Sequence, residues 1–404
     1  MASFIVNEQK VYTDNVSKYE DKLDSSLNRF IDKSPTFVTY YHIDNENSTT
    51  DSGLQNTDGV ISSYSSLRFK KITNFPIYGL EAITPQLTDE EQGLDSNYEG
   101  EAIVAPSTIQ PYPNDFFEIP YLKDRPLFRI SAVSYDSMRP EGYRKIDFRL
   151  ELIDDEIYEQ LQKQCMDNYT CIYKNVGSES KSIVRSEDYE RIQKINAMYS
   201  DMVSTYISTY YNERHNCFLG PDSSTGKYLY DPFMSKFIDD HGLFNRKDSY
   251  SAIVLSQQFT DTRRSFKYEK SIYRFIERND IGKINKFYYQ LVPATNYQES
   301  SFYRWMDKDI LVLDIPDLLC TNQAENFLFC QEYIDKVILN GETTNSYDTF
   351  IKDYLRGKID SINAIPLNLG EELLTLNISK ESFFFTPIIL YIIQTKMEEF
   401  MDKN

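Results

Sequence analysis

The sequence has few of the residues on which most catalytic and metal sites depend. It contains three histidines, five cysteines and one tryptophan among 404 residues. General acid–base catalysis near neutral pH most often uses histidine, and only His42, His215 and His241 are present. The cysteines stand at Cys165, Cys171, Cys217, Cys320 and Cys330 and form no Cys-X-X-Cys pair. Zinc sites need cysteine or histidine at short spacing, so the sequence predicts no catalytic centre, no metal site and no cofactor.

Long apolar runs are also missing. A membrane-spanning helix needs about 18 or more consecutive apolar residues. The longest apolar run, Phe383–Ile393, is shorter and leads into the charged residues Lys396 and Glu398, so we expect a buried helix there. The first ten residues, MASFIVNEQK, lack a basic stretch followed by an apolar one, and we expect no secretory signal. Together with the odd number of cysteines, this indicates reduced thiols and synthesis in a cytoplasm.

Basic residues are outnumbered by acidic ones. The chain carries 62 acidic and 43 basic residues, which gives a formal net charge of -19. Proteins bind duplex nucleic acid through clustered lysine and arginine, so this balance argues against a nucleic-acid-binding surface. Two local basic stretches, Arg68–Lys71 and Arg263–Lys270, are expected to be solvated faces of a strand or loop.

Tyrosine is the residue in excess. The chain has 32 tyrosines and 25 phenylalanines. Tyrosine combines a rigid apolar ring with a polar tip, which suits surfaces that are wet before assembly and dry after it. An AT-rich genome, whose codons favour tyrosine and phenylalanine, would give the same composition, and the two explanations are compatible.

The clearest structural pattern lies in residues 111–150. Apolar residues alternate over Phe116–Ile119, Leu127–Val133 and Tyr143–Leu150, and turns with proline or glycine separate the three runs. Such alternation is typical of antiparallel strands with one buried face. We therefore predict a compact antiparallel sheet.

Residues 73–110 do not follow this pattern. They contain several prolines and glycines, and acidic residues cluster at Thr88–Glu101. Long segments of this kind in compact domains are usually functional or disordered. We expect either an extended arm that reaches a neighbouring protein or a surface loop.

The remaining segments mix helical and strand patterns. Helical periodicity covers residues 1–34, Asp154–Cys165, Ser186–Tyr211, Pro232–Asp239, Asn322–Leu339, Thr349–Ile362 and Ser379–Met401. Further strands are expected at Thr36–Ile43, Val60–Ile72, Tyr169–Val176, Ser182–Val184, Tyr250–Gln257, Phe287–Val292 and Ile310–Ile315, and Tyr268–Arg278 fits either state. The fold class is therefore α+β. We divide the chain into an N-terminal helix, strand and linker (1–56), a β-rich domain with the arm (57–155), a helical region (156–245) and a C-terminal α+β region (246–404).

Some short motifs resemble functional sites. His215 and Cys217 would share a face of a strand, but a catalytic dyad also needs a third orienting group, and a structural pair is the better interpretation. His241 is expected at the end of a helix. Residues 220–228 imitate a phosphate loop, but the spacer is one residue too long and Tyr228 replaces the magnesium-binding hydroxyl.

Acidic motifs are equally unspecific. The loop Asp44–Gly53 lacks the ligand order and central glycine of a calcium site. Adjacent carboxylates such as Asp154–Asp155 and Asp239–Asp240 arise by chance among 62 acids. A glycosidase needs two carboxylates at a set separation across a cleft, so hydrolase activity stays an alternative that the sequence leaves open.

Several segments resemble structural proteins of tailed-bacteriophage particles. They are SSLRFKKITNFPIYGLE, YEGEAIVAPSTIQPYPNDFFEIP, LFRISAVSYDS, YRKIDFRLEL, YTCIYKNVGSESKSIV, YYNERHNCFL and YLYDPFMSKFIDDHGLF, in this order between residues 57 and 245. The resemblance is to components of the neck (head–tail connector) or the baseplate. It implies a multi-copy protein in a ring, located in the virion and held by sister subunits and by portal, neck, tail or baseplate proteins. It carries over no catalytic residue.

This resemblance agrees with the residue-level evidence. Ring assembly uses head-to-tail interfaces, which an extended arm can complete. The acidic charge could also keep packaged DNA from sticking to a channel wall. Two alternatives are a tail-associated cell-wall hydrolase and a host-receptor binding module, although receptor-binding fibres have repetitive β sequence that this chain lacks.

Overall fold

The computed structural model separates the chain into two compact units. The first comprises Met1–Tyr189 with Met401–Asn404, and the second comprises Glu190–Phe400. The residues that the structure describes are 35–48, 67–80, 84–87, 96–106, 108–120, 126–135, 143–151, 155–176, 181–222, 226–244, 267–279, 290–294, 309–315, 334–376 and 378–403. The predicted helix at 1–34 and the predicted strand at Tyr250–Gln257 lie outside them.

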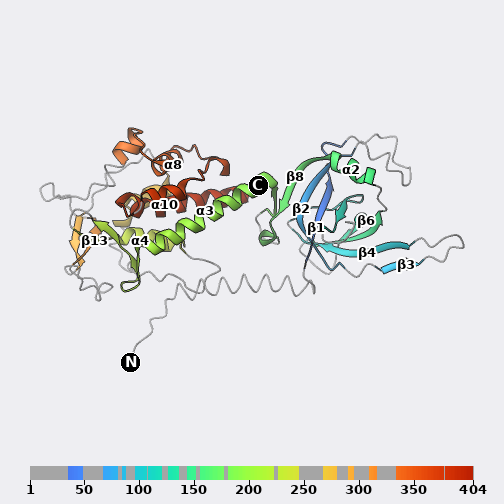
Figure 1. Cartoon of the computed structure of the whole chain (residues 1–404), viewed down its shortest axis with the longest axis horizontal. Coiled ribbons are helices and arrows are strands. Elements are labelled where there is room, and N and C mark those ends of the chain that lie inside the picture. Colours follow the sequence, from blue (N-terminus) through green and yellow to red (C-terminus); the bar gives the residue numbers. More distant parts are fainter. Residues whose placement is uncertain are drawn as a thin grey trace, which may run out of the picture. The chain divides into compact units, whose positions relative to one another are not determined.

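The first unit is built on one sheet of nine strands (Figure 1). The strands are β1 (Thr36–Ile43), β2 (Phe69–Tyr78), β3 (Thr84–Leu87), β4 (Ser96–Val104), β5 (Phe116–Glu118), β6 (Leu127–Tyr135), β7 (Arg144–Glu151), β8 (Cys165–Cys171) and β9 (Ile183–Arg185). Their order in the sheet is β3-β4-β7-β6-β5-β1-β2-β8-β9, and β4 also pairs with β2. All pairs are antiparallel except β2 with β8. The extra pairing closes β1, β2, β4, β7, β6 and β5 into a ring of strands.

A bulge in β2 makes this closure possible. Thr73 and Asn74 lie between the residues that pair with Val38 and with Tyr40 of β1, so two residues of β2 oppose one of β1. Asn74 has a φ of 56°, a left-handed conformation that asparagine adopts more readily than most residues. Before the bulge β2 pairs with β8, and after it the strand bends to pair with β4. Bulges bend strands in this way and commonly mark the corners of closed sheets.

Aromatic rings fill the interior of the closed sheet. Phe117, Phe128 and Phe148 are buried, and each ring lies 5.1 to 5.4 Å from the other two. Gly100 of β4 faces this group, because a Cβ atom there would lie 2.5 Å from Cζ of Phe148. Helix α2 (Asp155–Gln164) follows β7, and its Leu161 packs with residues of β1, β2, β5 and β6. The antiparallel sheet predicted for residues 111–150 is confirmed as β5, β6 and β7.

Residues 73–110 contain more regular structure than their composition suggests. The ends of this segment form parts of β2 and β4, and Phe75, Ile77, Ala102 and Val104 are buried in the core of the closed sheet. Between them, Thr84–Leu87 of β3 pairs with residues 96–99 of β4 as a two-stranded ribbon. Prolines and glycines lowered the strand signal here, although a proline is tolerated in an outer strand. The described parts of this segment thus belong largely to the sheet.

The second unit combines helices with a four-stranded sheet. Its helices are α3 (Ser186–Tyr210, which starts in the first unit), α4 (Pro232–Asp240), α6 (Ile272–Arg278), η6 (Ile334–Leu339, a π-helix), α8 (Ser346–Leu355), η7 (Ile362–Ala364, a 3-10 turn), α9 (Leu369–Thr375) and α10 (Lys380–Lys403). The sheet has the order β12 (Gly220–Asp222), β13 (Lys227–Tyr230), β15 (Ile310–Asp314) and β14 (Gln290–Pro293). β10 (Tyr211–Asn212) and β11 (Cys217–Phe218) form a separate pair. This unit completes the predicted α+β fold.

The long helices follow their sequence patterns. α3 matches the helix predicted for Ser186–Tyr211 and buries an apolar stripe, and α10 buries almost every residue of the apolar run Phe383–Ile393. Over the part of the chain that the structure describes, no helix has the length and apolar character to cross a membrane. The helix predicted for Thr349–Ile362 was wrong at its C-terminal end. It stops at Leu355 because Gly357, with a φ of 67°, ends it in a left-handed turn.

Candidate functional site

Asp115 is the centre of a buried polar cluster in the first unit. Its Oδ2 accepts hydrogen bonds from the Tyr40 hydroxyl at 2.8 Å and from the Tyr112 N–H at 2.9 Å. The same oxygen lies 2.9 Å from Nδ1 of His42, and Oδ1 accepts from the Ile43 N–H at 2.8 Å. The side chain of Asp115 is fully buried. The cluster therefore ties β1 to the turn that precedes β5.

The sequence before β5 explains why the carboxylate points inward. Asn114 has a φ of 73°, and the Asp115 N–H donates to the Tyr112 carbonyl at 3.1 Å, which makes a tight turn. The backbone of this turn is bonded to Ile130 of β6 on its other side. The His42 ring stacks on Tyr112 with ring centroids 5.3 Å apart. An aspartate can orient a catalytic histidine, but no described serine, threonine or cysteine is hydrogen-bonded to His42.

Glu118 forms a second cluster of the same kind. Its Oε2 accepts hydrogen bonds from the hydroxyls of Tyr41 at 3.0 Å and of Tyr158 at 3.1 Å. Gln162 donates to the Tyr41 hydroxyl at 2.7 Å. Burial, and then the charge of Glu118, raise the pKa of Tyr41 well above its usual range. The cluster fastens α2 to β1 and β5.

Asp231 has an equivalent place in the second unit. It caps α4, because its Oδ1 accepts from the N–H groups of Phe233 at 2.8 Å and Met234 at 3.1 Å. Its Oδ2 accepts from the Tyr273 hydroxyl at 3.0 Å, which joins α4 to α6. Burial raises the pKa of Asp231 to about 6, although these hydrogen bonds lower it in part. A capping role accounts for the carboxylate.

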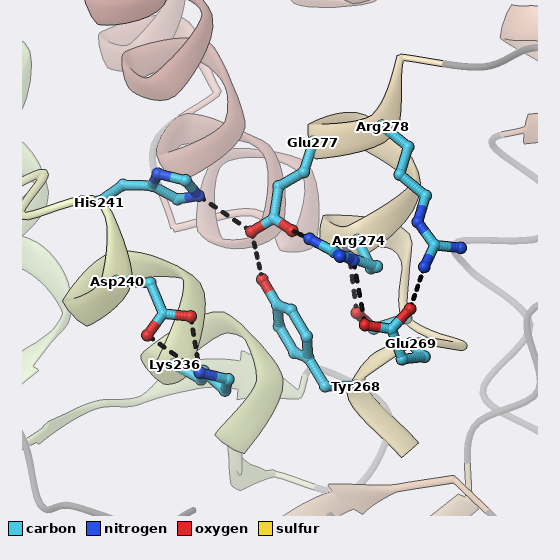
Figure 2. A network of polar contacts seen from close by, with 9 residues as sticks. Lys236, Asp240, His241, Tyr268, Glu269, Arg274, Glu277 and Arg278 are labelled. Carbon is cyan, nitrogen blue, oxygen red and sulfur yellow. Dashed lines mark hydrogen bonds and ion pairs between the residues drawn. The ribbon is translucent and has the colours of Figure 1, made fainter. Parts of the chain in front are cut away.

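Glu277 is the centre of a polar network in the second unit, shown in Figure 2. Its Oε1 accepts from the Tyr268 hydroxyl at 2.6 Å and lies 2.9 Å from Nε2 of His241, while Oε2 accepts from Arg274 at 2.8 Å. Burial alone raises the pKa of Glu277, but these hydrogen bonds outweigh it and lower the pKa to about 2. His241 stands at the end of α4, as the sequence predicts. The network connects α4 with α6.

Lys267, Arg274 and Arg278, in and before α6, form ion pairs within the unit. Lys267 lies 3.1 Å from Asp314, and Arg274 Nε lies 3.1 Å from Glu269. Arg278 also contacts Glu269. Of the predicted basic stretch Arg263–Lys270, residues 263–266 lie outside the described part of the chain.

The predicted Cys–His pair lies in the β10–β11 turn. The N–H of His215 donates to the Asn212 carbonyl at 3.3 Å, and Cys217 is buried. Burial raises the pKa of the Cys217 thiol well above its ordinary value, so the thiol stays protonated near neutral pH. A nucleophilic cysteine needs the opposite shift. The arrangement matches a structural pair.

The remaining sequence motifs adopt structural roles. Residues 220–222 lie in β12 and residues 227–228 in β13, and these two strands pair antiparallel, whereas a phosphate loop opens into a helix. Asp240 lies 2.6 Å from Lys236, and burial together with Asp240 raises the pKa of Asp239. The side chain of Asp154 lies outside the described residues.

Metal ligands do not gather in the described residues. Asp44 accepts from the Glu46 N–H at 3.1 Å and from the Asn47 amide at 2.6 Å, and Lys70 lies 3.5 Å away. Its oxygens are thus used within the loop. Across the described ranges, no group of three or more histidine, cysteine or acidic side chains could hold a metal ion.

Sequence reasoning missed the clusters around Asp115 and Glu277. His42 and Asp115 are 73 positions apart, and His241 and Glu277 are 36 apart, so no local motif connects them. The only local signal was the turn-forming Asn-Asp pair before β5. Tertiary contacts alone reveal these sites.

Two family models match the chain one after the other. Residues 10–185 match a phage head-tail joining protein, and residues 191–307 match the phage head to tail associated domain. The chain is a phage head–tail structural protein. No curated protein matches it.

The matches agree with the two units of the structure. The first model ends at residue 185 and the second begins at 191, on either side of the boundary between Tyr189 and Glu190. The predicted resemblance to a virion structural protein is therefore confirmed, and with it contact to other virion proteins. The buried clusters serve to hold each unit of this head–tail protein in shape.

Proposed function

We propose that this head–tail protein forms a ring of identical copies in the neck of a tailed phage, and that it acts by assembly without catalysis. The succession of a head-tail joining model and a head-to-tail associated model carries the proposal. In this role the chain binds sister copies and the portal or tail proteins next to it. Host cytoplasm is the proposed place of synthesis.

The ribbon of β3 and residues 96–99 of β4 is the proposed contact between copies. Figure 1 shows β3 and β4 on the side of the sheet away from β8. In the sheet β3 pairs with β4 and with no other described strand. A two-stranded ribbon is marginally stable in water by itself, so a further partner would stabilise it. The acidic segment Thr88–Glu101 follows β3 in the sequence.

The side chains support a role in contact more than in chemistry. Buried Asp115, Glu118 and Asp231 are engaged by tyrosine hydroxyls and backbone N–H groups within their own unit. The net charge of -19 suits a surface that must not adhere to DNA passing through a channel.

Electron microscopy of the particle tests the location and the ring. We expect density for this chain between head and tail, repeated around the particle axis. Density at the distal tail would favour the alternative role as a baseplate or tail component. A single copy off the axis would contradict the ring.

Limited proteolysis tests the ribbon separately. We expect cleavage within residues 73–110 in the free protein and protection of the same bonds in the particle. Equal cleavage in both would argue against a contact there. Peptidoglycan hydrolysis that is abolished by single carboxylate changes would instead support a tail-associated hydrolase.

A further inference from the structure

Three of the four outer strands in the two larger sheets carry a proline. The outer strands are β3 and β9 in the nine-stranded sheet and β12 and β14 in the four-stranded sheet. Pro85 lies in β3, Pro221 in β12 and Pro293 in β14. Proline has no N–H, and edge strands use it to prevent unwanted pairing. A proline blocks pairing at an edge only if its backbone hydrogen-bonding groups point to the free side of the strand.

In the four-stranded sheet both prolines turn outward. Backbone hydrogen-bonding groups alternate between the two sides of a strand. The Tyr228 N–H donates to Asp309, so Tyr228 faces β15, and Pro221, its partner in β12, faces away from the sheet. By the same alternation Val312 faces β14, which leaves Pro293 turned outward.

Pro85 also turns outward. Ile130 exchanges backbone hydrogen bonds with the turn before β5, so the preceding Arg129 faces β7. Arg129 pairs with Arg149, which therefore faces β6, and Glu99, opposite Arg149 in β4, faces β3. Glu99 pairs with Thr84, so the next residue, Pro85, has its backbone groups on the free side. Leu87 shares that side but keeps its N–H.

β9 is the outer strand of these sheets without a proline. The Ile172 N–H donates to the Ser182 carbonyl at 2.6 Å, so Ser182 and Val184 face β8 and Ile183 and Arg185 face outward. Neither backbone group of Ile183 has a backbone partner among the described residues. Unpaired groups of this kind are a template for strand addition.

Arg185 presents fewer free backbone hydrogen-bonding groups than Ile183. It directly precedes α3, and the carbonyl of a residue in this position accepts the first hydrogen bond of the helix. β9 therefore presents a donor and an acceptor at Ile183 but only a donor at Arg185. β3 presents a donor and an acceptor at Leu87 but only an acceptor at Pro85. The two free edges are complementary.

We propose that β9 of one copy pairs antiparallel with β3 of the next copy, with Ile183 opposite Leu87 and Arg185 opposite Pro85. Pro85 has no N–H to donate, and the Arg185 carbonyl opposite it already accepts a hydrogen bond from α3. This pairing therefore leaves no backbone group without a partner, whereas an ordinary strand beside β3 would leave a carbonyl unpaired opposite Pro85. This inference rests on the proposed ring, because joining two different edges gives the head-to-tail contact that a ring requires.

A photocrosslink in the assembled particle tests the pairing directly. The photoreactive residue p-benzoylphenylalanine replaces Arg185, which is exposed, and purified particles are irradiated. We expect a band of twice the chain mass whose crosslinked peptide contains β3 or the start of β4. A dimer band that maps elsewhere, a crosslink to another virion protein or no crosslink overturns the pairing. The ring is judged separately from the symmetry seen by electron microscopy.

A proline substitution tests the free N–H. Ile183→Pro removes the outward donor and no hydrogen bond between β8 and β9, and the first position of a strand tolerates proline. We expect incorporation into particles to fall by about tenfold or more, the effect of one unmade hydrogen bond at each interface. The control Ile183→Val keeps the donor and should be incorporated normally.

The opposite edge provides an independent variant. Leu87→Pro should reduce incorporation like Ile183→Pro, and circular dichroism melting establishes that each variant is folded. Normal incorporation of either folded proline variant would overturn the proposal.

Discussion

The closed sheet and the helical unit differ in how they hold two of their buried carboxylates, Asp115 and Glu277. In the sheet, Asp115 and Glu118 accept hydrogen bonds from tyrosine hydroxyls, and Asp115 also from backbone N–H groups. In the helical unit, Glu277 is paired with an arginine, whereas Asp231 is held by a tyrosine and by the helix that it caps. Neutral donors fix geometry, and a cation also offsets the unfavourable burial of charge. Removal of the Asp115 carboxylate and removal of the Glu277 charge should therefore lower the free energy of unfolding by different amounts.

The largest effect is expected for Asp115→Ala. The change leaves the Tyr40 hydroxyl and the N–H groups of Ile43 and Tyr112 without their acceptor inside the sheet. We expect the free energy of unfolding of the first unit to fall by about 3–5 kcal/mol in urea denaturation followed by circular dichroism. The control Glu101→Ala removes an exposed ion pair with Lys145 and should change it by less than about 1 kcal/mol.

Glu277→Gln should have the next largest effect, in the second unit. It removes the charge that pairs with Arg274 but keeps the shape of the side chain. We expect a loss of about 2–3 kcal/mol in the same measurement, because the hydrogen bonds lost involve charged groups. Asp240→Asn, which weakens the surface pair with Lys236, is the matched control and should lose less than about 1 kcal/mol. Equal losses would show that the Glu277 network adds nothing beyond a surface pair.

Alanine substitutions at two glycines test how tightly each of the two cores is packed. A Cβ atom at Gly220 would lie 2.7 Å from Cγ of Phe383, close to the base of the ring, whereas at Gly100 the nearest atom is Cζ, at the tip of Phe148. A ring tip moves more easily than a ring base. We expect Gly220→Ala to lower the melting temperature more than Gly100→Ala, with losses of about 2–3 and about 1 kcal/mol. The reverse order would mean that the closed sheet is the more tightly packed core.

The smallest effect on the free energy of unfolding is expected for Asp231→Asn. It should be seen in how that free energy changes with pH. The pKa of Asp231 is raised to about 6 in the folded protein, so its contribution to stability falls as pH rises from about 4 to 6. The pKa of Glu277 is lowered to about 2, so its contribution is present above about pH 4.5 and is lost as pH falls toward 2.

Melting curves between pH 2 and pH 8 separate these two contributions. Asparagine also caps helices, so Asp231→Asn should be neutral or stabilising by about 1–2 kcal/mol at pH 7 and should flatten the profile between about pH 4 and 6. Glu277→Gln should flatten it below about pH 4.5 only. A profile unchanged by Asp231→Asn would contradict the raised pKa.

Local patterns predicted elements well where burial follows a regular period. The strands of residues 111–150 and the apolar stripe of α3 could be read because alternate or helically spaced residues face the core. The strands in residues 73–110 were harder to predict, since Pro76 and Pro85 lie within strands and proline lowers the strand signal. The four-part domain division remains a prediction, beside the two units that the structure distinguishes.

The site residues could not have been found in the same way. Asp115 receives His42 and Tyr40 from β1, and Glu277 receives His241 from the end of α4. Each pair forms only when distant segments meet. In a chain with 62 acidic residues, composition does not distinguish the few carboxylates that become buried.

The order of residues alone was sufficient to establish the α+β class, the long amphipathic helix, the buried apolar helix near the end and the likeness to virion proteins. These properties depend on local periodicity and composition, which neighbours in the chain determine. Only the tertiary structure decided that the sheet closes through the bulge at Asn74, which carboxylates are buried and which strand edges stay open. Closure of the sheet, burial of carboxylates and the position of free edges depend on residues far away in the sequence. Contacts between such residues form, and stabilise the protein, only when the chain folds.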